Sequence, residues 1–270
     1  MAQPNNQQPQ QPQQPQQPVY DKSVYEVADI YIAKKISVPD YESPELATCT
    51  LPSGSEGPNS ETRWEQETKL LLEAIMRHIQ PQPCTWVLDY GCGIGRMAKV
   101  LCENGVNVIG VEVSESMRKL AREYVNDSKR FLCVSPEIFM GLTYHGFRVD
   151  AAISIFTFVH VDDINESCIQ VLESMKNNAH LFVAGYQRGR VRPLKVGDET
   201  KWVEEDIDIW RVMENYFGMN YTMPFPQELD PKKKLLARVY QRTISSAPDR
   251  EREERFKKMM QDSAAEMVKK

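Results

Sequence analysis

Residues 85–101 read TWVLDYGCGIGRMAKVL, and this stretch decides the fold. Residues 85–88 are β-prone and mostly apolar, which predicts a buried strand, and Asp89 follows at its end. Residues 96–101 have a helix-forming pattern. Between strand and helix, three glycines alternate with other residues: Gly91, Gly93 and Gly95. This order predicts a cradle for a nucleotide-like ligand, because glycine accepts positive φ and lets a ligand approach the backbone closely.

A second acidic residue follows the next predicted strand. Residues 107–111 read NVIGV and precede Glu112, about twenty residues beyond the first glycine, where doubly wound folds place a carboxylate that binds ribose hydroxyls. The glycines depart from the G-x-G-x-x-G pattern of dehydrogenases, because Arg96 stands in the place of its third glycine. Carboxylates at two strand ends suit a cofactor with a cationic amino acid end and a ribose diol, and they repel a pyrophosphate. The pair therefore favours a sulfonium cofactor over NAD.

On these residues the chain resembles the class I S-adenosylmethionine-dependent methyltransferases, most closely over residues 60–185. The resemblance implies an α/β fold: a doubly wound, Rossmann-like sheet of seven mostly parallel strands, with a reversed last strand and helices on both faces. It also implies a transferase that uses S-adenosyl-L-methionine as cofactor. The remaining strands are expected over residues 130–134, 149–156, 179–184, 221–225 and 235–242.

The resemblance and the composition together predict how the chain is divided. Residues 1–18 are almost wholly Gln, Pro and Asn, without charge or an apolar stripe, which predicts a disordered tail. Residues 19–60 are expected to form a cap helix and a loop, and residues 61–245 the methyltransferase domain. Residues 246–270 mix both charge signs and are expected to form a solvated tail or helix.

The overall composition disfavours several classes of partner. The formal net charge of −5 predicts no general attraction to nucleic acid. The six cysteines show no C-x-x-C pair and no metal-ligand spacing, so we expect no metal and reduced, buried thiols, as is typical of cytoplasmic proteins. No stretch approaches a membrane span, and the N-terminus does not read as a secretory signal. A cytoplasmic monomer or homodimer with a small-molecule substrate fits these features.

The resemblance also implies which residues hold the cofactor. Asp89 would hold the glycine turn and the cationic end of the cofactor, Glu112 would accept both ribose hydroxyls, and Cys92 would face the cofactor. Arg63 begins a helix predicted to run from residue 59 or 60 to Ile79, and it could pair with the cofactor carboxylate or be a solvated surface arginine. The expected cofactor-binding set is Arg63, Trp64, Asp89, Gly91, Cys92, Gly93, Glu112, Val113, Met117, Glu137 and Phe156.

The segment after the fourth predicted strand carries a histidine. Residues 157–162 read TFVHVD, similar to the hydrophobic-His-hydrophobic-Asp run of small-substrate methyltransferases, which lies beside the transferring methyl. His160 could act as a general base, because histidine titrates in the working pH range, or it could hold the loop by bonding to backbone. The preceding residues are not the Asn-Pro-Pro-aromatic run of amino-methylating nucleic-acid and protein-glutamine enzymes. A small-molecule substrate is therefore favoured.

An insertion at about residues 187–202 follows the fifth predicted strand, where α/β folds bind substrates. Arg188, Arg190 and Arg192 alternate within it, so an extended segment would project all three to one side. They could receive an anionic group of the substrate, or the insertion could be a solvated loop. A helix is expected after it, over residues 204–217.

Methyl transfer to an oxygen or nitrogen of a small molecule is the function that these features favour. Methylation of protein or RNA, and cofactor binding without catalysis in a regulatory protein, stay open as alternatives. A nucleotide-binding Rossmann protein of the dehydrogenase type is disfavoured by Asp89 and Arg96.

Overall fold

The computed structural model describes residues 60–161, 163–186, 190–196, 199–205, 207–226, 229, 235–242 and 258. The predicted Gln/Pro-rich tail and cap helix lie outside these residues, as does the C-terminal tail apart from Lys258. Within the described residues, no helix combines the length and the apolar character needed to cross a membrane.

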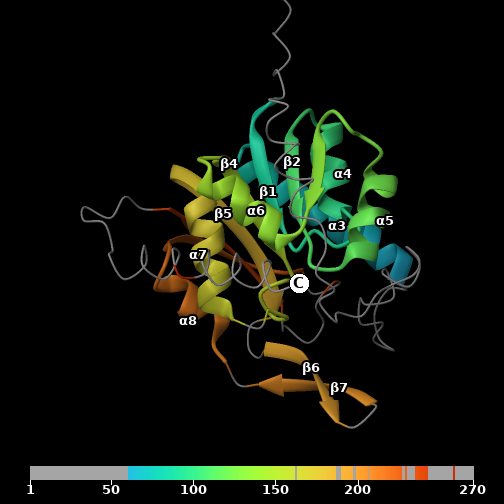
Figure 1. The fold of residues 1–270 in the computed structure, drawn as a ribbon, viewed down its shortest axis with the longest axis vertical. Coiled ribbons are helices and arrows are strands. Elements are labelled where there is room, and N and C mark those ends of the chain that lie inside the picture. The colour runs from blue at the N-terminus through green and yellow to red at the C-terminus, as the bar shows by residue number, and fades with distance from the viewer. Residues whose placement is uncertain are drawn as a thin grey trace, which may run out of the picture.

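One sheet of seven strands forms the centre of the molecule, in the order β3-β2-β1-β4-β5-β9-β8 (Figure 1). The strands from β3 to β5 are parallel, and β9 runs antiparallel to both of its neighbours. This confirms the predicted doubly wound sheet with a reversed last strand. Its strands are β1 (Trp86–Tyr90), β2 (Asn107–Val111), β3 (Phe131–Val134), β4 (Val149–Ile155), β5 (Met175–Tyr186), β8 (Gly218–Pro224) and β9 (Leu235–Gln241).

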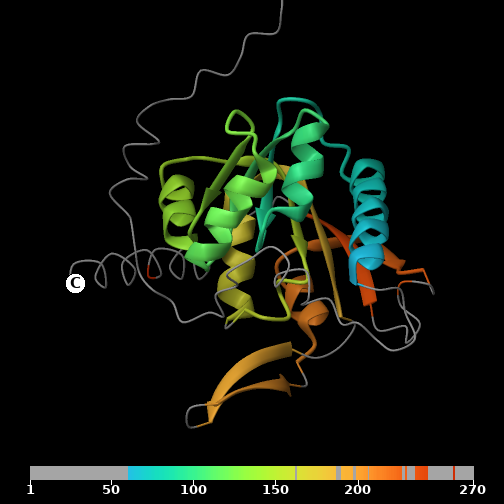
Figure 2. The same cartoon turned by 90° about the vertical axis from the view of Figure 1, so that its right-hand side faces the viewer.

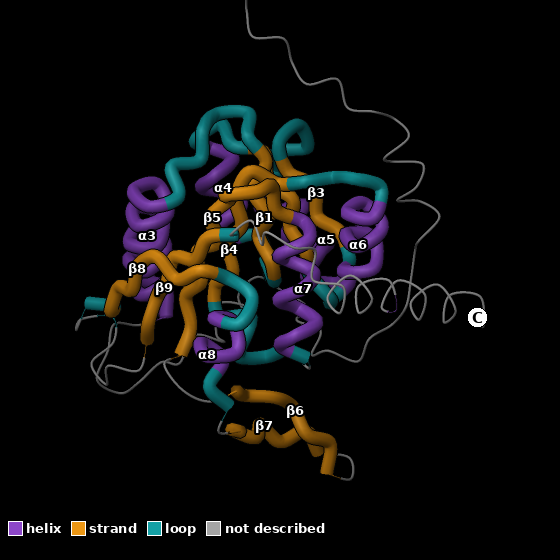
Figure 3. Tube along the Cα trace, turned by 90° about the vertical axis from the view of Figure 1, so that its left-hand side faces the viewer, coloured by secondary structure: helices purple, strands orange, loops and turns teal. Residues whose placement is uncertain are grey.

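Helices cover both faces of the sheet (Figures 2 and 3). The first face packs against α3 (Ser60–His78), α4 (Arg96–Glu103) and α5 (Glu115–Val125). The second packs against α6 (Pro136–Tyr144), α7 (Ile164–Ser174) and α8 (Ile209–Glu214). Two apolar cores result, one on each side.

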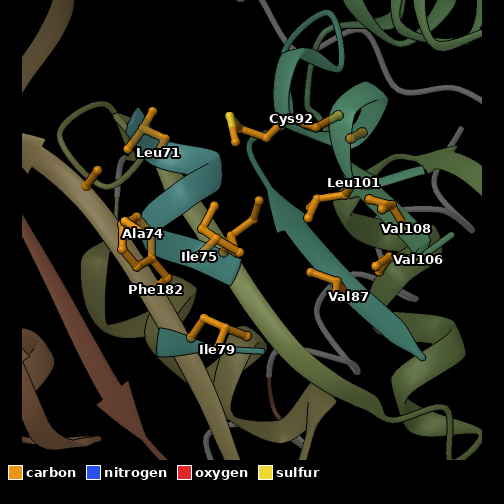
Figure 4. Packing of buried hydrophobic residues seen from close by; sticks show 14 of the residues in the cluster. Leu71, Ala74, Ile75, Ile79, Val87, Cys92, Leu101, Val106, Val108 and Phe182 are labelled. Atoms are coloured by element: carbon orange, nitrogen blue, oxygen red, sulfur yellow. The ribbon is translucent and has the colours of Figure 1, made fainter. Parts of the chain in front are cut away.

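Successive strand residues enter opposite cores, because side chains alternate along a strand. Val87 belongs to the first core and Leu88 to the second. Figure 4 shows part of the first core, where Ala74 and Ile75 of α3 lie beside Phe182 of β5. Burial on both faces explains why the parallel strands read as nearly continuous apolar runs in the sequence.

Side-chain caps fix the starts of two of these helices. The Ser114 hydroxyl accepts a hydrogen bond from the Met117 backbone N–H at the start of α5. The Asp163 carboxylate accepts one from the Glu166 backbone N–H at 3.0 Å, at the start of α7. Each bond satisfies a backbone donor that the first turn of a helix leaves without an intrahelical partner.

The insertion is a β-hairpin and not an irregular loop. β6 (Arg190–Val196) pairs antiparallel with β7 (Glu199–Glu205) in a separate two-stranded sheet. In the ribbon views this hairpin stands apart from the seven-stranded sheet, and it follows the carboxyl end of β5 (Figures 1 and 2). The insertion therefore runs further along the chain than predicted.

The helix predicted over residues 204–217 is shorter than expected. Residues 204 and 205 belong to β7, and α8 begins only after Asp208, whose carboxylate accepts from the Arg211 backbone N–H at 3.0 Å. Strand pairing in the hairpin thus overrides the helical pattern before this cap, and α8 ends at Glu214. The prediction of a helix starting at Glu204 is wrong for that reason.

Candidate cofactor site and acceptor edge

The glycine turn, residues 91–95, lies directly after β1. Gly91, Gly93 and Gly95 have φ values of 76°, 55° and 81°, so all three occupy the region that side chains disfavour. A Cβ on Gly91 would lie 2.1 Å from the Thr157 Oγ1, and one on Gly95 would lie 2.6 Å from the Val125 Cγ2. The turn therefore requires glycine for its backbone conformation at all three positions and for close packing at two of them.

Glu112 ties the end of β2 to the glycine turn. Its carboxylate accepts hydrogen bonds from the backbone N–H groups of Gly93 and Ser114, each at 3.0 Å. Burial raises the pKa of Glu112, and these backbone bonds act in the opposite direction. An ionised carboxylate offers about four acceptor positions, so the two bonds leave capacity for two ribose hydroxyls. Glu112 thus fits the predicted role, and the contact with a ribose itself stays a prediction.

Asp89 is directed toward the first turn of α4. It is only 3% exposed, and its carboxylate accepts from the Ala98 backbone N–H. Burial raises the pKa of Asp89 to about 7, against the lowering effect of the Arg96 charge. Asp89 therefore holds the helix that follows the turn, and its contact with the cationic end of a cofactor, through backbone or water, stays a prediction.

A buried ion pair joins α3 to α4 beside the turn. The Arg96 Nη1 lies 3.2 Å from the Glu67 Oε2, and the guanidinium stacks over the Trp64 ring at 4.8 Å from its centroid. Trp64 is thereby placed next to the helix that follows the turn. Sequence reasoning missed the pair, although Glu67 lies three residues after Trp64 on the same face of the predicted helix. Arg63 lies in α3, but its side chain is outside the described part of the structure.

The segment after β4 contacts the same turn. The Thr157 hydroxyl donates to the Gly91 carbonyl at 3.3 Å, and the Ser154 hydroxyl donates to the Tyr90 carbonyl at 3.1 Å. Phe156, between them, has a positive φ of 58° and donates its N–H to the Ala184 carbonyl at 2.7 Å. The carboxyl ends of β1 and β4 are therefore fixed to one another at the point where the strand order reverses, which is where α/β sheets bind ligands.

Of the other predicted cofactor residues, three lie near the turn or at the start of a helix, and one, Cys92, packs into the core. Met117 lies close to the turn, since its Cε would be 3.6 Å from a Cβ on Gly93. Val113 is exposed beside Glu112, and Glu137 lies in the first turn of α6. Cys92 is buried with its Sγ 3.7 Å from that of Cys133. Its side chain therefore packs into the core, contrary to the expectation that it faces the cofactor.

The predicted catalytic and substrate residues are only partly described. His160 is exposed, and its backbone N–H donates to the Thr157 carbonyl at 2.8 Å. Arg190 and Arg192 occupy alternate positions of β6, and Arg188 lies outside the described residues, so the role of the three arginines stays a prediction. The register pairs Glu205 with Arg190. In the described residues, no three or more His, Cys, Asp or Glu gather as a metal site.

Comparison with known proteins agrees with this geometry. A family model described as a methyltransferase domain matches residues 88–183. An uncharacterized methyltransferase of Geobacillus sp. is 34% identical over 91 residues, which are 34% of this chain and 41% of that protein. The 18S rRNA (guanine(1575)-N(7))-methyltransferase of Saccharomyces cerevisiae is 33% identical over 92 residues, which are 33% of this chain and 31% of that protein. The match thus spans less than half the length of these two relatives.

Solved structures share the fold at low sequence identity. A putative S-adenosylmethionine dependent methyltransferase from Listeria monocytogenes superposes with a TM-score of 0.51 at 14% identity, covering 68% of this chain and 99% of that chain. The glycine turn and Glu112 both fall within residues 88–183, which the family model matches. Residues 88–183 therefore match a methyltransferase domain, and the solved structure shares the fold of this chain.

Proposed function

We propose that the protein binds S-adenosyl-L-methionine and transfers its methyl group to an oxygen or nitrogen atom of a small molecule. The observation that carries this proposal is the bond between the Glu112 carboxylate and the Gly93 N–H at 3.0 Å. It joins an acceptor for ribose hydroxyls to a glycine turn that a ligand can approach closely. Arg96 stands where the dinucleotide-binding pattern has its third glycine, which disfavours NAD.

The chemistry divides between the cofactor and the chain. When bound, S-adenosylmethionine would supply an electrophilic methyl group for the acceptor atom, whose proton would be lost to a base or to water. The chain's own contribution is to orient the two reactants and to exclude water. Glu112 and the glycine turn hold the ribose end, and Phe156 and Thr157 lie where the acceptor enters. His160 is a candidate base for the acceptor proton.

The remaining parts of the chain have roles in the same proposal. Residues 61–245 make up the methyltransferase domain, and residues 19–60 form a cap over the cofactor. The hairpin of β6 and β7 lies on the acceptor side, where Arg190 and Arg192 attract an anionic group. Residues 1–18 are dispensable for cofactor binding. Five described cysteines are free thiols, which fits a cytoplasmic monomer or homodimer without a metal.

Methylation of RNA is the second candidate, because one relative is named as an rRNA methyltransferase. The net charge of −5 and the Ser-Ile-Phe-Thr sequence of residues 154–157 favour the small molecule. Binding of the cofactor without catalysis is the third candidate, since methyl transfer in this fold needs few obligatory side chains.

Two linked measurements test the proposal on the full chain. Titration calorimetry should show binding of S-adenosylhomocysteine and none of NAD⁺, and the reverse result contradicts the cofactor assignment. Radiolabelled methyl transfer from S-adenosylmethionine should then be followed into small-molecule, RNA and protein fractions of a cell extract. Label in the small-molecule fraction supports the proposal. Label confined to RNA or protein, or no label despite cofactor binding, selects one of the alternatives.

A further inference from the structure

Three aromatic rings meet on the acceptor side of the glycine turn, and we call them the aromatic cluster: Phe156, Tyr186 and Phe225. The ring centroid of Phe156 lies 6.1 Å from that of Tyr186 and 6.3 Å from that of Phe225, with interplanar angles of 53° and 45°. The rings come from the ends of β4, β5 and β8, so only the folded sheet brings them together. Phe225 is buried, whereas Phe156 and Tyr186 keep part of their surface exposed.

The backbone under the cluster is held in an unfavourable conformation. Phe156 has a φ of 58°, which is an outlier for a bulky side chain. Its N–H bond to the Ala184 carbonyl, at 2.7 Å, and the contact of Thr157 with Gly91 fix that conformation. Strain of this kind persists where the surrounding structure enforces it and is concentrated at functional sites. The strained residue, Phe156, is thus followed directly by Thr157, whose hydroxyl contacts Gly91 of the glycine turn.

The other side of the cluster is also anchored. The Trp210 indole N–H of α8 donates to the Tyr186 carbonyl at 2.9 Å, which fixes the end of β5. Ile155 and Met223 pack into the same apolar core as the three rings. These side chains carry no charge, so a charged acceptor group that packed against them would lose its hydration without gaining an ion pair. An uncharged aromatic ring would instead gain buried contact area.

We propose that the aromatic cluster is the acceptor subsite, and that the acceptor is a planar aromatic compound bearing a hydroxyl or amino group. This inference rests on the proposed function and names the class of its substrate. The ring of the acceptor packs on Phe156 and Tyr186, which directs its hydroxyl or amino group toward the glycine turn. The Phe156 ring lies beside both other rings, so the cluster offers an aromatic surface against which a flat molecule can pack.

A matched pair of probes separates ring stacking from simple hydrophobicity. 2-Naphthol and decahydro-2-naphthol share a carbon skeleton and a hydroxyl, but only the first is planar and aromatic. With the full chain saturated by S-adenosylhomocysteine, ligand-observed NMR titration should show 2-naphthol binding about tenfold more tightly, since each favourable ring pair adds to area burial. Equal binding, or tighter binding of the more apolar saturated probe, overturns the inference.

Variants locate the subsite. Tyr186→Leu keeps an apolar side chain and should weaken 2-naphthol binding at least fivefold, with S-adenosylhomocysteine affinity retained as proof of folding. Phe156→Gly removes the second ring at a backbone position that glycine adopts freely, and should also weaken 2-naphthol binding. Tyr144→Leu, an exposed tyrosine on α6, is the matched control and should change neither affinity.

The outcomes distinguish this inference from the proposed function. If S-adenosylhomocysteine binds the wild type but Tyr186→Leu leaves 2-naphthol binding unchanged, the aromatic subsite is wrong and the methyltransferase assignment stands. If choline, a non-aromatic cation, binds more tightly than 2-naphthol, the acceptor class is wrong. If S-adenosylhomocysteine itself does not bind, the proposed function fails and the inference fails with it.

Discussion

The two sides of the carboxyl edge of the sheet are built in different ways. On the side of β1 and β2, backbone groups form most of the site: three glycines with positive φ and a carboxylate bonded to two backbone N–H groups. On the side of β4, β5 and β8, three aromatic side chains from separate elements meet. The first arrangement lies within a short stretch of chain, and the second depends on the complete sheet.

This difference teaches how the two binding tasks are divided. Backbone groups in a defined conformation can bind a cofactor of fixed shape. Only a few residue types permit such a conformation, so this kind of site leaves a local pattern in the sequence. An acceptor is met by side-chain shape, which many residues can supply from distant positions. Each substitution below alters one side of this edge, and the substitutions follow in order of decreasing expected effect.

Gly91→Val should have the largest effect. The added side chain would overlap the Thr157 side chain, 2.1 Å from a Cβ, and a β-branched residue is strained at a φ of 76°. We expect S-adenosylhomocysteine binding to be lost in calorimetry and the free energy of unfolding to fall by about 3 kcal/mol or more.

Gly146→Val is the matched control for Gly91→Val. Gly146 has a φ of 94°, but a Cβ at this position would have no atom within 4 Å, so only the backbone strain is shared. It should lower stability and leave the affinity for S-adenosylhomocysteine intact. Equal affinities of the two variants would show that the turn does not contact a cofactor.

Arg96→Leu should be the most damaging change to stability outside the turn itself. It leaves the buried Glu67 carboxylate without its guanidinium at 3.2 Å, and breaking a buried pair destabilises by about 3 kcal/mol. Urea unfolding checks this value. Lys99→Leu, in the exposed pair with Glu103 on the same helix, should change stability by less than about 1 kcal/mol. Similar losses in both variants would contradict a special role of the buried pair.

Glu112→Ala should weaken S-adenosylhomocysteine binding by more than tenfold, because charge-assisted bonds contribute about 1.5–3 kcal/mol each. Calorimetry on the folded variant measures the effect. Glu123→Ala, an exposed carboxylate on α5, removes the same charge away from the turn and should leave the affinity unchanged. A Glu112→Ala protein that is folded and binds as tightly as wild type would refute the ribose assignment.

Asp89→Asn should change how stability depends on pH. The pKa of Asp89 is about 7 in the folded protein and 3.8 in the reference state. A raised folded pKa means that its stabilising contribution is fully present below the unfolded pKa and is lost as pH rises through the folded pKa. The stability of the variant relative to wild type should therefore increase by about 2 kcal/mol from pH 5 to pH 7. A constant difference over this range would show that Asp89 is ionised throughout.

The paired Arg190→Ala and Arg192→Ala substitutions should have the smallest effect. Comparing 2-naphthol with 3-hydroxy-2-naphthoate isolates the contribution of a carboxylate to acceptor binding. We expect the substitutions to reduce the preference for the acid about threefold, with part of that loss reproduced by added salt. Glu205, opposite Arg190, limits the effect. An unchanged preference for 3-hydroxy-2-naphthoate would show that the hairpin does not bind the acceptor carboxylate.

Much of the fold follows from local patterns in the sequence. The buried strands appear as apolar runs, and Ser114 and Asp163, residue types that favour helix starts, cap α5 and α7. The helix expected from Glu204 fails, because pairing between β6 and β7 decides the state of that residue and no local pattern records such pairing.

The candidate site is predictable on one side only. The positive φ of the glycines follows from their spacing, and Glu112 follows from its distance to them. The burial of Cys92 against Cys133 and the pairing of Arg96 with Glu67 depend on how helices pack across the sheet. The aromatic cluster is still harder to foresee, since Phe225 follows β8, which joins the sheet only through the reversed strand β9.

A crystal structure of the full chain with S-adenosylhomocysteine tests the central claim most directly. The account predicts both ribose hydroxyls within hydrogen-bonding distance of the Glu112 carboxylate, the backbone of the glycine turn against the ligand, and the sulfur directed toward Phe156. A ligand bound elsewhere, or one whose ribose lies away from Glu112, would contradict the account.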